Sequence, residues 1–359
     1  MNNNIPIYKE ALSSIPPFQP DKTNAGLWYN KFFGIELDKD EQTKDKDTED
    51  NYKTKKIKEF SNKPIGSDEL IKELVSRQKE IIKSMHGHYM LFKNTSKFLT
   101  GVGNSHPTEI GFTWHHTLGV PYLPGSSIKG LVRSYCENQN INKEDIKRIF
   151  GSMNKNNEDD VQKENNENSV GSVIFLDALP YKHVKLAGDI MTPHYNDYYQ
   201  NAETPGDWIM PIPIPFLVVE KDQEFLFGII PRSPKTDKND IDLAKEWLEK
   251  ALKTLGAGAK TSVGYGIFEL TEEVTEGDLW LKKLEEYKKL GLNDKVDIPN
   301  ITQIVQEWEK ESDPELKRSI AEAIKKRINV IYTGPNYWNN PLGGKIKKAI
   351  EKLKNTLGE

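Results

Sequence analysis

The chain has 359 residues and a formal net charge of −4, and 36% of its residues are hydrophobic. This length predicts about two domains with well-buried cores. No run of about eighteen apolar residues is present, which argues against a membrane-spanning helix, and the start lacks the basic and apolar regions of a secretory signal. The one cysteine, Cys136, excludes an internal disulfide and a zinc site built on thiolates. We therefore expect a cytoplasmic protein without a membrane partner.

The charges are unevenly distributed along the chain. No acidic residue lies between Glu109 and Glu137 or between Glu249 and Glu269, whereas both stretches contain lysine. A general nucleic-acid binder usually has a strongly basic domain, and the overall charge argues against that class. The two acid-free stretches nevertheless predict a local positive surface on an acidic protein.

The first 66 residues divide into an arm and a linker. Residues 1–35 combine prolines with aromatic residues and predict an extended N-terminal arm that packs on a core. In the first part of residues 36–66, lysines alternate with acidic residues, and almost no side chain there is apolar. This composition predicts a charged linker that is solvated or disordered.

Helices and strands alternate in the pattern of residues 67–272. Apolar residues at helical spacing predict a helix over 68–84, with Ser67 as its N-cap. The turn of residues 220–223 separates two β-rich runs and predicts a hairpin. The order suits a ferredoxin-like βαββαβ unit with a long insertion at about 183–210. Its further elements are strands at 89–99, 170–179, 212–219, 224–230 and 265–270, and helices after 126, at 143–150 and at 240–255.

Residues 273–359 have a helical pattern throughout and predict a C-terminal helical extension. Charges four residues apart, such as Glu322 and Lys326, are typical of solvent-exposed helix faces. The fold class expected for the whole chain is α+β, with this extension following the ferredoxin-like body. The helices predicted in the extension are 278–290, 300–311, 314–331 and 343–357.

A glycine-rich loop follows a predicted helix and precedes a predicted strand. Its glycines permit positive φ and close approach of a ligand, and successive N–H groups can form an anion-binding nest beside Lys260. A P-loop is excluded because Ala259 stands where that motif requires glycine, and a dinucleotide fingerprint would follow a strand. A tight helix-to-strand connection remains the alternative. The candidate binding residues are Gly256, Gly258, Lys260, Thr261, Ser262, Gly264 and Gly266.

A second candidate segment lies in the other acid-free stretch. Ser126 and Ser127 stand at a predicted helix N-terminus, where they can cap the helix and where free N–H groups and the helix dipole favour an anion. Lys129 and Arg133 are four residues apart and share the face opposite the apolar stripe. An ordinary capped helix with two exposed cations is the alternative.

Patterns for metal binding and catalysis are weak. The histidine pairs at 86/88 and 115/116 lack a carboxylate at helical spacing, so no metal or other cofactor is expected. Asp189 and His194 could form an acid–base pair. They lie in a loop bounded by proline, however, and nothing in the sequence brings their side chains together, which favours a structural role.

Residues 99–112, LTGVGNSHPTEIGF, and 118–133, LGVPYLPGSSIKGLVR, together closely resemble the RAMP superfamily of CRISPR effector proteins. Within it, the resemblance is to a subunit of the type III-B (Cmr) RNA-targeting complex. Residues 24–28, residues 189–195 and the glycine-rich loop agree with it, so that it covers roughly residues 24–270. The helical extension departs from the compact pattern of the family.

The resemblance implies a ferredoxin-like or RNA-recognition-motif fold whose glycine-rich loop and first helix line a surface for guide RNA. It implies a backbone subunit in antiviral defence, near the 3′ end of the guide, in contact with other RAMP subunits and the guide–target RNA duplex. The target-cleaving aspartate of the family belongs to a sister subunit, so this chain is expected to be non-catalytic. The insertion at about 183–210 would correspond to the thumb-like hairpin of RAMP backbone subunits.

Several residue patterns suit this interpretation. Acid-free segments suit a phosphate backbone that is bound without regard to sequence. Aromatic side chains near the glycines and in the insertion could stack on bases. These are Tyr195, Tyr198, Tyr199 and Tyr265.

Two other functions remain open. A metal-dependent endoribonuclease would use Asp189 and His194, as in guide-processing relatives of the superfamily. A protein-only scaffold would use its glycines for packing alone. Cleavage of RNA in the presence of Mg²⁺ and crosslinking to RNA distinguish the three functions.

Overall fold

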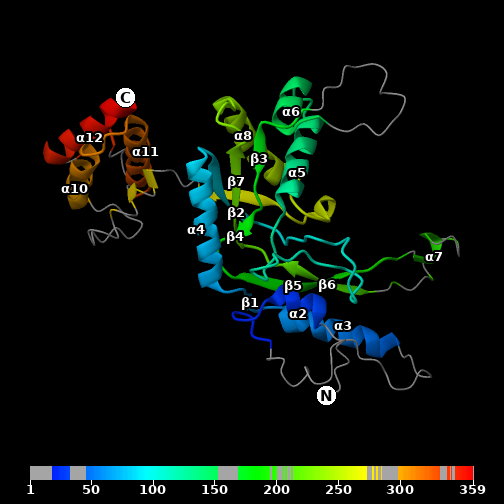
Figure 1. Ribbon diagram of the computed structural model, residues 1–359. Coiled ribbons are helices and arrows are strands. Elements are labelled where there is room, and N and C mark those ends of the chain that lie inside the picture. Colours follow the sequence, from blue (N-terminus) through cyan, green and yellow to red (C-terminus); the bar gives the residue numbers. More distant parts are fainter. Residues whose placement is uncertain are drawn as a thin grey trace, which may run out of the picture. The chain divides into compact units, whose positions relative to one another are not determined.

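The chain forms two compact units, Met1–Glu272 and Glu273–Glu359, in a computed structural model (Figure 1). No helix among the described residues is long and apolar enough to cross a membrane. The structure describes residues 18–32, 46–152, 169–194, 196–199, 204, 206, 208, 211, 213–272, 277, 278, 280, 281, 284, 298–331, 338, 339, 341 and 344–358.

The larger sheet of the first unit has the strand order β3-β7-β2-β8, and the short β4 (Leu179–Pro180) also pairs with β7. All of its pairings are antiparallel. The third strand of the βαββαβ series lies between the first two and the fourth lies outside the first, which is the ferredoxin-like arrangement. The predicted α+β class is therefore confirmed. The series consists of β2 (His88–Asn94), α5 (Gly125–Asn138), β3 (Val173–Phe175), β7 (Glu224–Pro231), α8 (Lys238–Thr254) and β8 (Phe268–Glu272).

Helices cover both faces of this sheet. On one face, α4 (Asp68–Ser84) packs against β2 and β7, and Gly228 leaves room for it, because a Cβ there would lie 2.6 Å from Ile82 Cδ1. On the other face, α5 and α8 pack on each other and on β3. The last residue of α6 (Lys143–Phe150) stacks on Phe175 of β3, with ring centroids 5.7 Å apart. Successive strand residues point to opposite faces, so both helical layers find apolar partners.

A smaller antiparallel sheet has the order β1-β5-β6. Its strands are β1 (Pro64–Ile65), β5 (Val184–Met191) and β6 (Ile214–Val219). The paired arms β5 and β6 come from the insertion between β4 and β7 and lead towards the short helix α7 (Asn196–Tyr199). This sheet positions the insertion relative to the ferredoxin-like body.

The predicted hairpin of residues 212–219 and 224–230 is wrong. Both strands form, but β6 belongs to the smaller sheet and β7 to the larger one. Residues 220–223 are the corner between the two sheets. A turn pattern indicates where the chain reverses, and it does not indicate which strands pair on either side.

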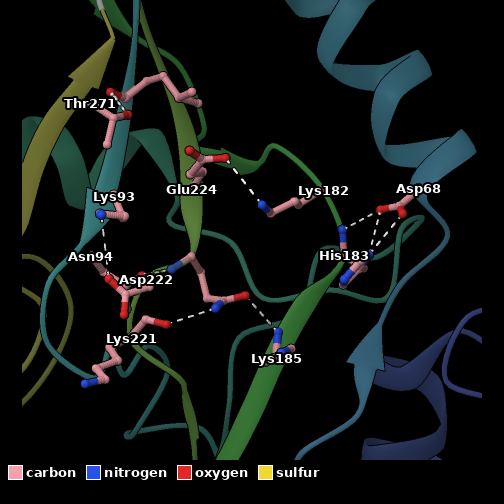
Figure 2. Close-up of polar contacts among 12 residues, drawn as sticks. Asp68, Lys93, Asn94, Lys182, His183, Lys185, Lys221, Asp222, Glu224 and Thr271 are labelled. Atoms are coloured by element: carbon pink, nitrogen blue, oxygen red, sulfur yellow. Dashed lines mark hydrogen bonds and ion pairs between the residues drawn. The ribbon is translucent and has the colours of Figure 1, made fainter.

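A buried amide holds this corner (Figure 2). Asn94 at the end of β2 is fully buried, and its Nδ2 donates hydrogen bonds to the carbonyl oxygens of Ser96 and Glu220, at 2.7 and 2.9 Å. Its Oδ1 accepts a hydrogen bond of 2.8 Å from the backbone N–H of Gln223. The larger sheet thus fixes the point at which the chain leaves the smaller one.

The predicted linker is corrected over residues 46–60, which form the helix α3. The helix packs on β5 and β6, with Ile57 only 2% and Phe60 only 3% exposed. The mostly buried Lys53 forms an ion pair with Glu109, with Nζ 2.8 Å from Oε1. Few apolar residues anchor this helix, so its composition resembles that of a disordered segment.

The described part of the predicted N-terminal arm contains α2 (Ala25–Lys31). Asn24 caps this helix by accepting a hydrogen bond from the N–H of Leu27. The ring of Phe18 packs against Trp28 and Phe60, with centroids 5.8 and 4.8 Å apart. Residues 18–32 are therefore attached to the body by aromatic contacts.

The second unit contains α10 (Ile298–Glu309), α11 (Pro314–Ile331) and α12 (Gly344–Leu357) around one apolar core. Most of the helix predicted at 278–290 lies outside the described residues. Glu322 pairs with Arg318, at 3.5 Å, rather than with Lys326 as the spacing suggested. Both cations lie one turn from Glu322, so spacing alone could not choose between them.

Candidate nucleic-acid interface

The candidate segment around Ser126 and Ser127 places a helix N-terminus beside a carboxylate of the same chain. Helix α5 begins at Gly125 with Pro124 as its N-cap, and the backbone N–H of Gly125 donates a hydrogen bond of 2.7 Å to Oδ1 of Asp177. Ser126 and Ser127 are exposed residues inside the first turn and do not cap the helix. The predicted serine cap is therefore wrong, and Asp177 already fills part of the anion-favouring position.

Lys129 lies one turn further along α5, close to two arginines. Burial lowers its pKa, and the positive charges of Arg232 and Arg133 lower it further. The lysine has no carboxylate partner among the residues that the structure describes. A half-buried ammonium group repelled by two guanidinium groups favours an external anion.

The two arginines each donate hydrogen bonds to acceptors of the body. Arg133 donates to Glu137 Oε1 at 2.9 Å and to the carbonyl oxygen of Gly151 at 3.3 Å, and its side chain is 20% exposed. Arg232 donates from Nε to the carbonyl oxygen of Gly171 at 2.7 Å. Arg133 therefore has a structural role in addition to the predicted binding role. Arg232, at the end of β7, was missed because no local pattern connects it to α5.

The glycine-rich loop is tied to the segment after β2 by backbone hydrogen bonds. The N–H of Ala259 donates to the carbonyl oxygen of Leu99, and the N–H of Gly266 donates to that of Lys97, at 2.7 and 2.8 Å. A further bond of 2.7 Å joins Ala257 N–H to the oxygen of Gly266 and closes the base of the loop. The loop is thus a rigid part of the body.

The four glycines of this loop have different roles. A Cβ at Gly258 would overlap the carbonyl oxygen of Leu99, and a Cβ at Gly266 would overlap that of Ala257. Gly256 is similarly close, since its Cβ would lie 3.0 Å from the carbonyl oxygen of Gly266. At Gly264, by contrast, φ is +93° and nothing lies within 4 Å of the Cβ position. Three glycines therefore permit packing, and one faces open space.

The tip of the loop is a turn of 3₁₀ helix, η2 (Thr261–Val263). Ser262 is exposed and Val263 is 68% exposed. Lys260 precedes the turn with φ of +58°, and its Nζ lies 5.8 Å from the centre of the Phe216 ring in β6. The loop thus presents a lysine, a hydroxyl and exposed backbone together beside the smaller sheet. That these groups lie on one surface with Lys129 stays a prediction.

Asp189 is engaged by two side chains of the body. Oδ2 accepts hydrogen bonds from Lys97 Nζ at 2.9 Å and from the Tyr265 hydroxyl at 2.7 Å. Burial works to raise the pKa of this carboxyl group, but the hydrogen bonds from Lys97 and Tyr265 outweigh it and lower the pKa. His194 is exposed, beyond the end of β5. Among the described residues, no three histidine, cysteine or acidic side chains form a group that could hold a metal ion.

Replacing Asp189 with asparagine should make Tyr265 easier to ionise. Burial, followed by the hydrogen bond and the charge of Asp189, raises the pKa of Tyr265 to about 12. An amide removes the charge, so the pKa should fall but stay above its usual value of about 10, because the burial remains. Carbon-13 NMR of the tyrosine rings as a function of pH measures it, with Tyr265→Phe assigning the resonance. An unchanged titration would contradict the contact.

Aromatic side chains of the insertion are exposed. Tyr198 and Tyr199 of α7 are 46% and 76% exposed, and Trp208 is 70% exposed. The two tyrosine rings lie edge to face, with centroids 5.5 Å apart. Tyr195 lies outside the described residues. Exposed rings of this kind can stack on bases, and Trp208 was not among the residues predicted to do so.

Comparison with known proteins agrees with this architecture. Residues 91–269 match the model of the RAMP superfamily. The CRISPR system Cmr subunit Cmr6 of Pyrococcus furiosus is 31% identical, in an alignment that covers 56% of this chain and 74% of that protein. The Cmr6 subunit of Saccharolobus solfataricus is 31% identical over 211 residues, which cover 57% of this chain and 66% of that protein.

The fold also resembles a solved structure. A chain in the cryo-EM structure of the type III-B Cmr-beta complex bound to cognate target RNA superposes with a TM-score of 0.51. The match covers 68% of this chain and 80% of that one, at 24% identity, and it supports the fold. The relatives found by sequence assign the chain to a narrower family than the fold does. The chain therefore belongs to the RAMP superfamily and, within it, to the Cmr6 subunits of CRISPR systems.

Proposed function

We propose that this chain is a non-catalytic, RNA-binding backbone subunit of a cytoplasmic type III-B effector complex. It contacts the guide RNA near its 3′ end and the guide–target duplex, beside other RAMP subunits. The observation that carries the proposal is the cluster of Lys129, Arg133 and Arg232. Burial is the largest cause that lowers the pKa of Lys129, and the charges of the two arginines lower it further. Lys129 also lacks a carboxylate partner among the described residues.

A phosphate is the ligand that suits this cluster best. Lysine binds phosphate as a compact charge, and arginine presents a planar fork of donors. The exposed hydroxyl groups of Ser126 and Ser127 can donate to the same backbone. None of these groups selects a base, so the contact suits a guide whose sequence varies.

The glycine-rich loop provides the second contact of the proposal. Lys260, Thr261, Ser262 and the open backbone at Gly264 are assigned to RNA. Gly256, Gly258 and Gly266 act indirectly, because they hold the loop against the body. The exposed tyrosines of α7 and Trp208 are assigned to stacking on bases, as in a thumb-like insertion.

The non-catalytic part of the proposal is supported by Asp189. Its carboxylate is bound to Lys97 and Tyr265, which suits a structural role better than proton transfer or metal binding. Incubation of the purified chain with labelled RNA and Mg²⁺ tests this part. No cleavage is expected, and cleavage that disappears in Asp189→Ala would favour the endoribonuclease.

Reversing the charge of Lys129 and Lys260 together, to glutamate, should release the guide from the assembled complex as salt rises. At low salt the other subunits hold the RNA, so the loss becomes visible between roughly 0.1 and 0.5 M salt, where phosphate contacts weaken steeply. The fraction of labelled guide retained after gel filtration measures it. Lys55→Glu with Lys72→Glu, at two exposed lysines, makes the same change of net charge and is the control. Equal retention by both double variants would contradict the proposal.

A further inference from the structure

The helical unit has an uneven distribution of charge. Several of its acidic side chains are paired, as in Glu309 with Lys352 and Glu322 with Arg318. Glu307 also pairs with Lys310, at 2.8 Å. The pairs neutralise much of the acid on α10 and α11, so the net charge of the surface depends on the cations that remain.

Several of those cations belong to α12. The helix contains five lysines and a single acidic residue, Glu351. Its apolar residues Ala349, Ile350 and Leu353 are buried in the core of the unit, which turns the lysines outward. Lys345, Lys347 and Lys348 are exposed and have no carboxylate partner among the residues that the structure describes.

A buried tryptophan brings a lysine of α11 to the same surface. The ring of Trp338, only 2% exposed, has Lys325 Nζ at 5.6 Å and Lys354 Nζ at 5.9 Å from its centre. Lys354 also donates to Asn339 Oδ1 at 3.3 Å. Two ammonium groups of different helices therefore lie over one ring. We call Lys325, Lys347, Lys348 and Lys354 the α12 lysine surface.

We propose that the α12 lysine surface binds the phosphate backbone of RNA, separately from the RNA surface of the body. Lys347 and Lys354 are two helical turns apart, about 10 Å along the helix axis, so both can contact phosphates of one strand. Trp338 is buried and offers no ring on which a base could stack. The contact is therefore to phosphates and is independent of sequence.

RNA is favoured over an acidic protein as the occupant because the proposed function already brings RNA to this chain. The inference rests on that function only for the identity of the polyanion. The lysines themselves are evidence for a polyanion of either class, and the experiment must separate the two.

The double variant Lys347→Gln with Lys348→Gln tests the surface in the full chain. Binding of a fluorescent poly-uridine RNA should weaken roughly tenfold, and the slope of log affinity against log salt should fall by about 1.4, the value for two lost single-strand contacts. Lys310→Gln with Arg318→Gln is the matched control, because it removes the same charge from two paired cations of the same unit. It should leave both quantities nearly unchanged. Circular dichroism checks that both variants remain folded.

Each of the following outcomes would overturn the inference. Equal effects of the two double variants would mean that only net charge matters, and no binding of poly-uridine by the full chain would remove the site. Binding of polyglutamate that is as tight, and equally sensitive to Lys347→Gln with Lys348→Gln, would assign the surface to acidic protein. If the Lys129 and Lys260 variant alone released RNA, the proposed function would stand and this inference would fail.

Discussion

Replacing Gly266 with alanine should destabilise the first unit by about 4 kcal/mol. The residue has φ of +72°, which costs a side chain about 1–2 kcal/mol. Its Cβ would also overlap the carbonyl oxygen of Ala257, so the backbone must move. That movement weakens the bonds that join Gly266 to Ala257 and Lys97, each contributing about 1 kcal/mol. Urea unfolding, followed by tryptophan fluorescence and circular dichroism, measures the loss in the transition of the first unit.

Gly264→Ala is the control within the same loop. Its φ is also positive, but nothing lies near its Cβ position, so only the backbone strain of about 1 kcal/mol should appear. Similar losses in both variants would contradict the division of the glycines into packing and open positions. A large loss of RNA retention in Gly264→Ala with no more than this small loss of stability would place this glycine at the RNA itself.

The fold was largely predictable because its signals are local. Periodicity located α4, and Ser67 caps it as predicted by accepting a hydrogen bond from the N–H of Leu70. The order of helices and strands indicated the ferredoxin-like unit. The partners of β6 were not predictable, since pairing depends on contacts between distant segments. Glu220, for instance, is 126 residues from the amide of Asn94 that holds it.

The candidate site was predictable only in part. Helical spacing placed Lys129 and Arg133 on one helix face, and the structure keeps them together with Arg232. Glu137, one turn beyond Arg133, forms an ion pair with it that was not predicted. Asp177 was not, because it reaches Gly125 across 52 residues of chain. Composition could not distinguish the glycines that permit close packing from the one that faces open space, because the distinction depends on which atoms surround each glycine in the fold.

Replacing Asn94 with leucine should destabilise the first unit by about 3–5 kcal/mol. The substitution leaves the carbonyl oxygens of Ser96 and Glu220 without a donor and the N–H of Gln223 without an acceptor. A buried polar group without its partner costs about 1–3 kcal/mol, and leucine offers neither a donor nor an acceptor to these three groups. The loss, relative to the unsubstituted chain, should be nearly independent of pH.

Asn94→Asp provides the discriminating comparison. Aspartate keeps an acceptor for Gln223, but at neutral pH it places a buried charge against the oxygens of Ser96 and Glu220. Burial and these acceptors should raise its folded pKa above the usual value of about 3.9. With the folded pKa raised, the protonated form is the stabilising one, so the loss relative to the unsubstituted chain should be smaller at about pH 5 than at about pH 8. Equal losses at both pH values, or a loss below about 1 kcal/mol for leucine, would mean that the corner does not depend on this amide.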